Sequence, residues 1–375
     1  MPALAFLSVY LIWIFFSISI SSIGVASFLK IWTTFLDYVG IGVLTINVIT
    51  TRQRLLRLID VILIPTTFVS LYGIYGYFTR QNGVVDSVTS FRIFSIFSAA
   101  PALALLLSIV IPLAIYRTFT LRGYKRIGSL IPILILLVAL VLTFTRSAFI
   151  SLPLSIIIMI FLLPRGKLKV GLLSITSVLV VATVLLATLG HVPLFDRFLN
   201  QDIATLNGRT YLWQAVLDHF DPTQLLGNGL LASDILLTNL GVGSGGNVIA
   251  TAPHNLFLGT LYDHGVIGLI LLTLVFLTLL ISLIRGIRKA TGDQRMLFAA
   301  ALAAFVNMLL QSLLSRDFWT QAIAIYFWII MALPFALYWS TSKQISRTSE
   351  ESLAETAEVH MQTMQQEERE QLAKV

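Results

Sequence analysis

The chain alternates long apolar runs with short polar connections. A helix needs about 20 apolar residues to cross a hydrocarbon core of ~30 Å, and its backbone polar groups must bond within the segment because lipid offers no partners. The runs predict an all-α, polytopic membrane protein with about ten transmembrane helices. The expected spans are residues 3–22, 32–50, 58–78, 99–116, 128–144, 147–163, 170–190, 266–284, 297–315 and 319–339.

The main departure from this pattern is the stretch 191–265, where polar and glycine-rich sequence replaces the apolar runs. We therefore expect transmembrane helices 1–7 within residues 1–190, one long extracytoplasmic loop with short helices in 191–265, and transmembrane helices 8–10 within 266–339. Residues 340–375 contain every glutamate of the chain and are expected to form an acidic, solvated cytoplasmic tail. The membrane part therefore has no glutamate for chemistry.

Composition and charge support this arrangement. Hydrophobic residues make up 57% of the chain and charged residues only 11%, which excludes an ordinary soluble domain. Cysteine is absent, so there is no disulfide framework and no thiolate metal site. The net charge of +7 arises in short connections, which indicates membrane topology rather than nucleic-acid binding.

The basic residues also predict an orientation. They gather in the connections 51–57, 117–126, 165–169 and 285–295, which alternate with connections that hold few Lys or Arg residues. Because basic loops stay in the cytoplasm, both termini are expected there and the loop 191–265 is expected on the periplasmic side of the inner (plasma) membrane.

Arg146 is one of the few arginines expected on the opposite side. It lies in LTFTRSAF, residues 142–149, a connection so short that the helices on either side must form a tight hairpin. An arginine in this place either anchors a helix end at the membrane surface or binds an anionic group. Both interpretations remain open from the sequence.

The first half of the long loop contains the run NGRTYLWQAVLDHF, residues 207–220. Asn207 is expected to cap a helix that carries Arg209 at its start and ends before Asp221 and Pro222. Apolar residues at four-residue spacing predict that one face of this helix packs on the bundle or the outer leaflet. The predicted face consists of Leu212, Trp213, Val216, Leu217 and Phe220.

The second half of the loop contains APHNLFLGTLYDHGVIGL, residues 252–269. Pro253 suits the first turn of a helix, which places His254 and Asn255 at a helix N-terminus, where an anion is favoured. A histidine there stays neutral more readily and suits a base, although it could also only hydrogen-bond loop to bundle. Gly265 is expected to break the helix. The other loop histidines, His191, His219 and His264, are expected to be structural.

The loop lacks the usual metal and nucleotide signatures, because HExxH, a phosphate-binding loop and Asp-x-Asp are all missing. Its aspartates show no spacing that singles out a pair, and they are expected to solvate the loop surface. We therefore expect neither a metal nor a cofactor. The aspartates in question are Asp196, Asp202, Asp218, Asp221, Asp234 and Asp263.

Several of these segments resemble a known family. GRTYLWQAVLDHF, LLGNGL and APHNLFLGTLYDHGVIGLI are similar to the long-loop signature of the O-antigen ligase and O-antigen polymerase family. LTFTRSAF and SFRIFSIFSAAPALALLL resemble two shorter motifs of the same family, with Ser95 where the family has glycine. Members commonly have about twelve spans and this chain about ten, with the difference at the N-terminus.

The resemblance implies a metal-independent glycosyltransferase of polysaccharide or lipopolysaccharide biosynthesis. Such enzymes move a glycan from a polyprenyl-pyrophosphate carrier to a hydroxyl of a glycan, lipid or protein acceptor, within the membrane and without nucleic acid. It also implies that His254 and Arg209 belong to the reaction centre, with Arg146 as a second guanidinium. Substrate contacts are expected from Asn255, Trp213 and Arg92.

Two choices stay open at this point. Ligation to an acceptor and polymerisation of repeat units share the same motifs, so the sequence does not separate them. The main alternative from another class is a transporter of a small anion such as bicarbonate, and a non-catalytic scaffold is a further one. Transport usually requires ionisable groups at mid-membrane or internal repeats, whereas the expected spans hold only Asp37 and Asp60, each near a helix end.

Overall fold

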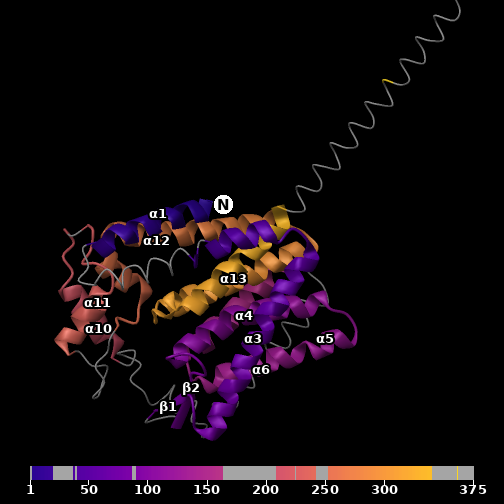
Figure 1. Ribbon diagram of the computed structural model, residues 1–375, viewed down its shortest axis with the longest axis horizontal. Coiled ribbons are helices and arrows are strands. Elements are labelled where there is room, and N and C mark those ends of the chain that lie inside the picture. The colour runs from indigo at the N-terminus through magenta and orange to yellow at the C-terminus, as the bar shows by residue number, and fades with distance from the viewer. Residues whose placement is uncertain are drawn as a thin grey trace, which may run out of the picture.

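The computed structural model describes residues 2–19, 37–38, 40–86, 90–163, 208–223, 225–241, 252–339 and 361. These residues form a helical bundle, with two short helices at one side (Figure 1). The elements are α1 (Pro2–Ser19), α3 (Arg52–Thr79), β1 (Gly83–Asp86), β2 (Ser90–Ile93), α4 (Ala100–Thr120), α5 (Tyr124–Gly128), α6 (Leu130–Leu142), α7 (Arg146–Leu162), α10 (Arg209–Asp218), α11 (Ala232–Leu240), α12 (Leu256–Lys289), α13 (Gly292–Ser312), the 3₁₀ turn η1 (Asp317–Trp319) and a last helix, Gln321–Trp339.

The apolar runs correspond closely to these helices. Within the described part of the chain, six helices are long and apolar enough to cross a membrane: α3, α4, α5 with α6, α12, α13 and the last helix. Helices α1 and α7 contain shorter apolar stretches at the places of two further expected spans. The expected span 170–190 and residues 32–36 and 39 of the span 32–50 lie outside the described residues, as do His191, Asn207 and the tail apart from residue 361, whereas residues 40–48 are helical.

Helices α4 and α13 form the centre of the bundle. Helix α13 packs against α4, α7 and α12, while α1 lies along α12 (Figure 1) and α3 packs on α6 and α4. The middle of α13 reads AAALAAF, residues 299–305, and all of these side chains are buried. Small residues let helix backbones approach closely in a bilayer, where packing rather than water drives helix association. The alanine run therefore explains why α13 occupies the centre.

A polar cluster joins three of these helices inside the bundle. The Asn307 side chain accepts from the Ser151 hydroxyl and from the Gln311 amide, and donates to the Ser108 carbonyl and the Ser155 hydroxyl. Buried polar groups in lipid require such partners. These five residues include no ionisable group, so the cluster connects helices and lacks the charge that ion transport normally uses.

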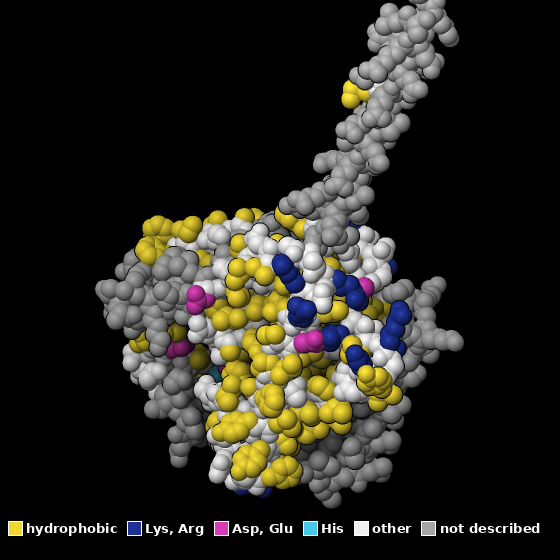
Figure 2. Space-filling model, turned by 45° about the vertical axis from the view of Figure 1, so that its right-hand side comes forward, with side chains coloured by type: hydrophobic (Ala, Val, Ile, Leu, Met, Phe, Trp, Pro, Cys, Tyr) yellow, Lys and Arg dark blue, Asp and Glu magenta, His cyan; other side chains and the backbone are white. Residues whose placement is uncertain are grey.

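The alternating helices bring the basic connections to one end of the bundle, which we call the basic face. There Arg52 of α3 bonds Asp293 of α13 at 2.8 Å, and Nε and Nη2 of Arg117 donate to the two carboxylate oxygens of Asp60 at 2.7 and 2.8 Å. Figure 2 shows Lys and Arg side chains gathered on one part of the surface, beside a broad hydrophobic area. Asp60 is thus explained as an ion-pair partner at a helix end.

The opposite end, which we call the loop face, carries α10, α11, η1 and a small β-hairpin. Strands β1 and β2 pair antiparallel, with Val84 opposite Arg92. The hairpin corrects the expectation of a purely helical chain, because two four-residue strands leave no long alternating pattern to detect. Just after it, Ser95 has φ 56°, in the left-handed region that glycine prefers, which fits the glycine that the family motif carries there.

Candidate functional site

The site is built around a break in α12. At Gly265 the backbone has φ 69° and ψ −174°, so the helical hydrogen-bond ladder is interrupted there, as expected from the sequence. The loop segment 225–229 runs through this break and replaces the missing bonds. The amides of Asn228 and Gly229 donate to the carbonyls of Tyr262 and Asp263 at 3.0 and 2.9 Å, and the Ile267 amide reaches the Leu225 carbonyl at 3.5 Å.

Helix α1 holds the same break from its other side. The Trp13 indole donates to the His264 carbonyl at 3.0 Å, and the Ser17 hydroxyl donates to the Asp263 carbonyl at 3.1 Å. The His264 ring lies buried, with its Nδ1 2.8 Å from the Ser17 hydroxyl. His264 is therefore a structural histidine, in agreement with the prediction.

The two loop helices pack on the start of α12 through a small apolar core. Leu212 and Val216 of α10 are fully buried against Leu237 of α11 and Tyr262 of α12. The predicted apolar face of α10 is thus confirmed at Leu212 and Val216. It is wrong at Leu217, which is 49% exposed, because the packed face is narrower than the sequence stripe.

The ends of α10 differ from the prediction. Its N-cap is Gly208 in the left-handed conformation, so Arg209 occupies the first helical position. The helix ends at Asp218, before the expected Asp221 and Pro222. Asp221 instead accepts hydrogen bonds from the amide and hydroxyl of Thr223, and so forms a turn.

His254 lies in a tight turn immediately before α12. Its φ of 48° is in the left-handed region, and the next residue, Asn255, caps the helix by accepting from the amides of Phe257 and Leu258 at 3.0 Å each. The helix therefore begins at Leu256, and Pro253 precedes it rather than occupying its first turn. The expected place of His254 and Asn255 at a helix N-terminus is confirmed.

Two predicted substrate contacts, Asn255 and Trp213, serve this turn. The side-chain oxygen of Asn255 accepts the two capping hydrogen bonds of α12, and the Trp213 indole of α10 donates to the Pro253 carbonyl at 2.9 Å. Both side chains thus hold the backbone on which His254 is mounted. Their contact with a substrate stays a prediction.

The electrostatics at His254 favour its neutral form. Desolvation by neighbouring protein atoms, and then the positive charges of Arg209 and Arg316, lower the pKa of His254 from 6.5 to about 4, although the residue is exposed at the surface. An imidazole at this pKa is unprotonated at neutral pH and has a free lone pair. The expected neutral state is supported, but neighbouring cations and burial cause it rather than the helix end alone.

Arg316 is the residue of this site that the sequence analysis left without a role. It lies between α13 and η1, and its guanidinium bonds the carboxylates of Asp234 and Asp263 and the Ser233 hydroxyl. Asp263 is fully buried and also accepts from the Ser233 amide at 2.8 Å. The expectation that these two aspartates solvate the loop surface is therefore wrong, because both pair with one buried arginine.

Asp234 and Asp317 complete the charges around the cluster. Burial, together with the nearby negative charge of Asp263, raises the pKa of Asp234 to about 6, and Arg316 opposes that rise. Burial also raises the pKa of Asp317, against the bond from Ser315 and the positive charge of Arg209. Arg209 and Arg316 thus lie near the His254 imidazole, while Asp234 and Asp263 bond Arg316 and Asp317 lies near Arg209.

Comparison with known families identifies this part of the chain. Residues 131–273 match the family model described as O-antigen ligase, and the match runs from α6 through α10 and α11 to the broken start of α12. This segment is similar to the O-antigen ligase family. The resemblance found in the sequence is thereby confirmed, and the match supports membrane glycan transfer of the ligase type and not the anion transporter. A comparison with curated proteins found no match.

The ligase-family segment includes Arg146, which the helix packing brings to the loop face. Ser151 near the start of α7 bonds Asn307 near the end of α13, and Arg295 near the start of α13 bonds the carbonyl of Leu162 at the end of α7. These two contacts show that the helices run antiparallel. Five residues back from Ser151, Arg146 is therefore level with the last turn of α13. Its role in the reaction stays a prediction.

Arg92 lies outside the ligase-family segment but contacts it. Its Nε donates to the carbonyl of Thr143 at 3.0 Å, in the turn that links α6 to α7. Arg92 thus supports the turn that precedes Arg146. A substrate contact from Arg92 is not tested by this bond.

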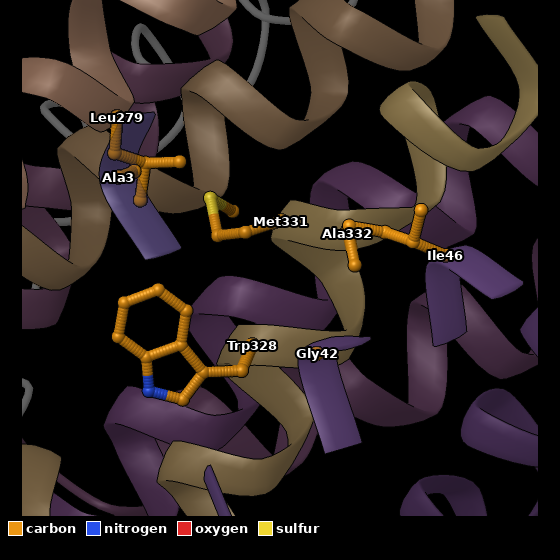
Figure 3. Close-up of a pocket in the computed structure, with 7 residues that line it drawn as sticks. All are labelled: Ala3, Gly42, Ile46, Leu279, Trp328, Met331 and Ala332. Carbon is orange, nitrogen blue, oxygen red and sulfur yellow. The ribbon is translucent and has the colours of Figure 1, made fainter. Parts of the chain in front are cut away.

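A small apolar crevice lies elsewhere, inside the bundle (Figure 3). It lies between α1, the helical stretch 40–48, α12 and the last helix, and Trp328 lies about two turns after the start of that last helix. The crevice offers hydrocarbon and one indole, so it contributes no group to transfer chemistry. Its lining residues are Ala3, Gly42, Ile46, Leu279, Trp328, Met331 and Ala332.

Proposed function

We propose that the protein is a metal-independent glycosyltransferase that moves a glycan from a polyprenyl-pyrophosphate carrier to an acceptor hydroxyl. The observation that carries the proposal is the position of His254 beside Arg209 and Arg316, on the loop face of a membrane bundle whose residues 131–273 are similar to the O-antigen ligase family. An imidazole beside two guanidiniums matches a reaction that deprotonates a hydroxyl and releases an anion.

The proposed step is a substitution at the anomeric carbon of the donor sugar. The acceptor oxygen forms the new glycosidic bond while its proton passes to the free nitrogen of His254. The bond from the anomeric carbon to the pyrophosphate oxygen breaks, and the electron pair leaves with the pyrophosphate. No oxidant, reductant or further reactant is needed.

The guanidiniums are assigned to the leaving group. Arg209 and Arg146 form charge-assisted hydrogen bonds with the pyrophosphate and stabilise the charge that develops on it. The bound anion also raises the pKa of His254, because a nearby negative charge favours imidazolium. Donor binding therefore converts a weak base into a stronger one in the complex that reacts.

The location of the cluster suits a lipid-linked donor. The pyrophosphate of a polyprenyl carrier lies at the membrane surface while its chain stays in the hydrocarbon, and the loop face is the end of an apolar bundle. We assign this face to the extracytoplasmic side, because the basic connections lie at the opposite end. Lipid or glycan acceptors reach the same face.

The test uses the purified protein in proteoliposomes with a fluorescent oligosaccharide on a polyprenyl-pyrophosphate carrier. We expect transfer in excess EDTA, and a loss of at least ~10²-fold in His254→Ala and in Arg209→Gln. His219→Ala is the matched control, because this exposed histidine at the end of α10 bonds only its own helix among the described contacts. It is expected to keep wild-type transfer.

The same assay separates the two reaction types. Polymerisation is indicated if the donor alone yields a ladder of longer carrier-linked glycans. Ligation is indicated if an added lipid-linked core oligosaccharide yields a single product. The proposal is wrong if His254→Ala and Arg209→Gln proteins that insert normally still transfer the glycan at the wild-type rate. Activity abolished by EDTA and restored by a divalent ion would contradict the metal-independent mechanism.

A further inference from the structure

Arg316 bonds two carboxylates and a hydroxyl at the loop face. One guanidinium reaches Asp234 and Ser233 of α11 and, at 3.0 Å, Asp263 of α12. The side chains of Arg316 and Asp263 are 14% and 1% exposed, so water does little to screen this pair. By contrast, Arg52 and Asp293 on the basic face are 52% and 34% exposed. The buried network depends on the forked geometry of arginine.

The start of α12 is shaped to receive this guanidinium. A Cβ placed on Gly259 would lie 3.0 to 3.2 Å from the Nε, Cζ and Cδ atoms of Arg316, closer than ordinary packing allows. Gly259 lies only five residues after His254, on the first turn of the helix that His254 precedes. The absence of a side chain there lets Arg316 lie flat on α12, close to the proposed reaction centre.

Arg316 also joins elements that are far apart in the sequence. Helix α11 packs on α10 and on the start of α12, while the connection that holds Arg316 continues from the central helix α13. The guanidinium therefore connects the loop helices to the rigid centre of the bundle. A shift of about 1 Å in such a connection is enough to reduce catalysis ~10²-fold.

We propose that Arg316 is a positioning residue: by bonding Asp234 and Asp263 together it fixes α10, α11 and the His254 turn in one geometry over the bundle. This inference rests on the proposed glycan transfer and assigns Arg316 no contact with the substrate. Its positive charge has a second effect, since it is one of the two cations that keep His254 neutral. A lysine at position 316 would retain that charge but lose the planar guanidinium that bonds both carboxylates at once.

The test compares Arg316→Lys, Arg316→Gln and Asp234→Asn in the proteoliposome assay, together with titration of His254 by NMR in ¹³C-histidine-labelled protein. His254→Ala assigns the signal. Arg316→Lys is expected to reduce kcat/KM about tenfold or more while His254 titrates as in the wild type, because only geometry is lost. Arg316→Gln is expected to reduce it further and to move the titration of His254 upward.

Asp234→Asn keeps the shape of the side chain and Arg316 itself, so it guards against a simple failure to fold. A loss of about threefold to tenfold in kcat/KM is expected, because Arg316 then retains Asp263 alone. Arg52→Gln removes an exposed ion pair at the basic face and is the matched control, with no expected change in either measurement.

The positioning role is wrong if Arg316→Lys and Asp234→Asn keep wild-type kcat/KM, or if Arg316→Gln leaves both the rate and the His254 titration unchanged. These results differ from a failure of the proposed function, in which the wild-type protein itself transfers no glycan. In that case the titration still decides: a His254 titration that moves in Arg316→Gln but not in Arg52→Gln supports the connection, and an unmoved one refutes it.

Discussion

Gly265→Ala is expected to detach the loop from the break in α12. The wild-type backbone has φ 69° and ψ −174° at this position, a combination that residues with a side chain scarcely adopt. The added Cβ would also lie 2.1 Å from the Leu225 carbonyl oxygen and 2.5 Å from the Gly227 amide nitrogen. Both neighbours are backbone atoms of the docked segment, so the only relief is movement of that segment away from α12.

The expected cost follows from two terms. Forcing alanine into this conformation costs about 1–3 kcal/mol. Separation of the segment 225–229 breaks two good backbone hydrogen bonds, at 3.0 and 2.9 Å, a side-chain bond from Asn228 at 3.2 Å and one long backbone bond, worth together about 2–3 kcal/mol at roughly 0.5–0.75 kcal/mol each. The free energy of local opening should therefore fall by about 3–6 kcal/mol, which corresponds to about 10² to 10⁴ in the opening equilibrium.

Amide hydrogen exchange, read by mass spectrometry on peptides that cover 225–230, measures this opening. Exchange there should accelerate by at least about 10²-fold, while peptides from α4 and α13 stay protected because the bundle does not depend on the loop. The matched control is Gly123→Ala, since Gly123 has φ 58° but no atom within 4 Å of an added Cβ. Exchange at 225–230 within about threefold of the wild type in Gly265→Ala would refute the reasoning.

Two further variants test the helix cap and the orientation. Asn255→Ala removes the cap of α12 and should lower the free energy of unfolding by about 1 kcal/mol, which is measured as a lower Tm. Asn47→Ala is the control and should keep the wild-type Tm, because the Asn47 amide donates to the Val43 carbonyl of its own helix. An equal Tm in both variants would contradict the capping role. The chain has no cysteine, so Leu217→Cys places a single thiol at an exposed site of α10. This thiol should react in whole cells with a membrane-impermeant maleimide, whereas the thiol of Tyr124→Cys on the basic face should not. The opposite labelling would reverse the orientation.

Much of the bundle could be predicted because lipid simplifies the sequence. A helix in hydrocarbon needs a long apolar run, and the expected spans 58–78 and 99–116 lie within or nearly within α3 and α4. Extra length was missed at the ends, where polar residues such as Arg52 and Thr120 continue a helix beyond the hydrocarbon. Hydropathy measures the apolar core, whereas the helix follows backbone hydrogen bonds.

The site could be predicted only in part, because its parts differ in how local they are. The cap at Asn255 and the break at Gly265 depend on neighbours within a few residues, so the sequence indicates both. The pairing of Arg316 with Asp234 and Asp263 spans 82 and 53 residues, and no local pattern records it. Composition alone suggested solvated aspartates, since unpaired carboxylates are usually exposed.

The short length of the loop helices explains why the site needs these distant ties. Helices α10 and α11 have 10 and 9 residues, and isolated helices shorter than about 12–15 residues are marginal in water. Among the described residues, their shared core holds four buried side chains, one of which, Tyr262, belongs to α12. The loop therefore takes its order from the broken start of α12 and from Arg316. Arg209 and His254 keep their separation because both are anchored, through different contacts, to the same interrupted helix.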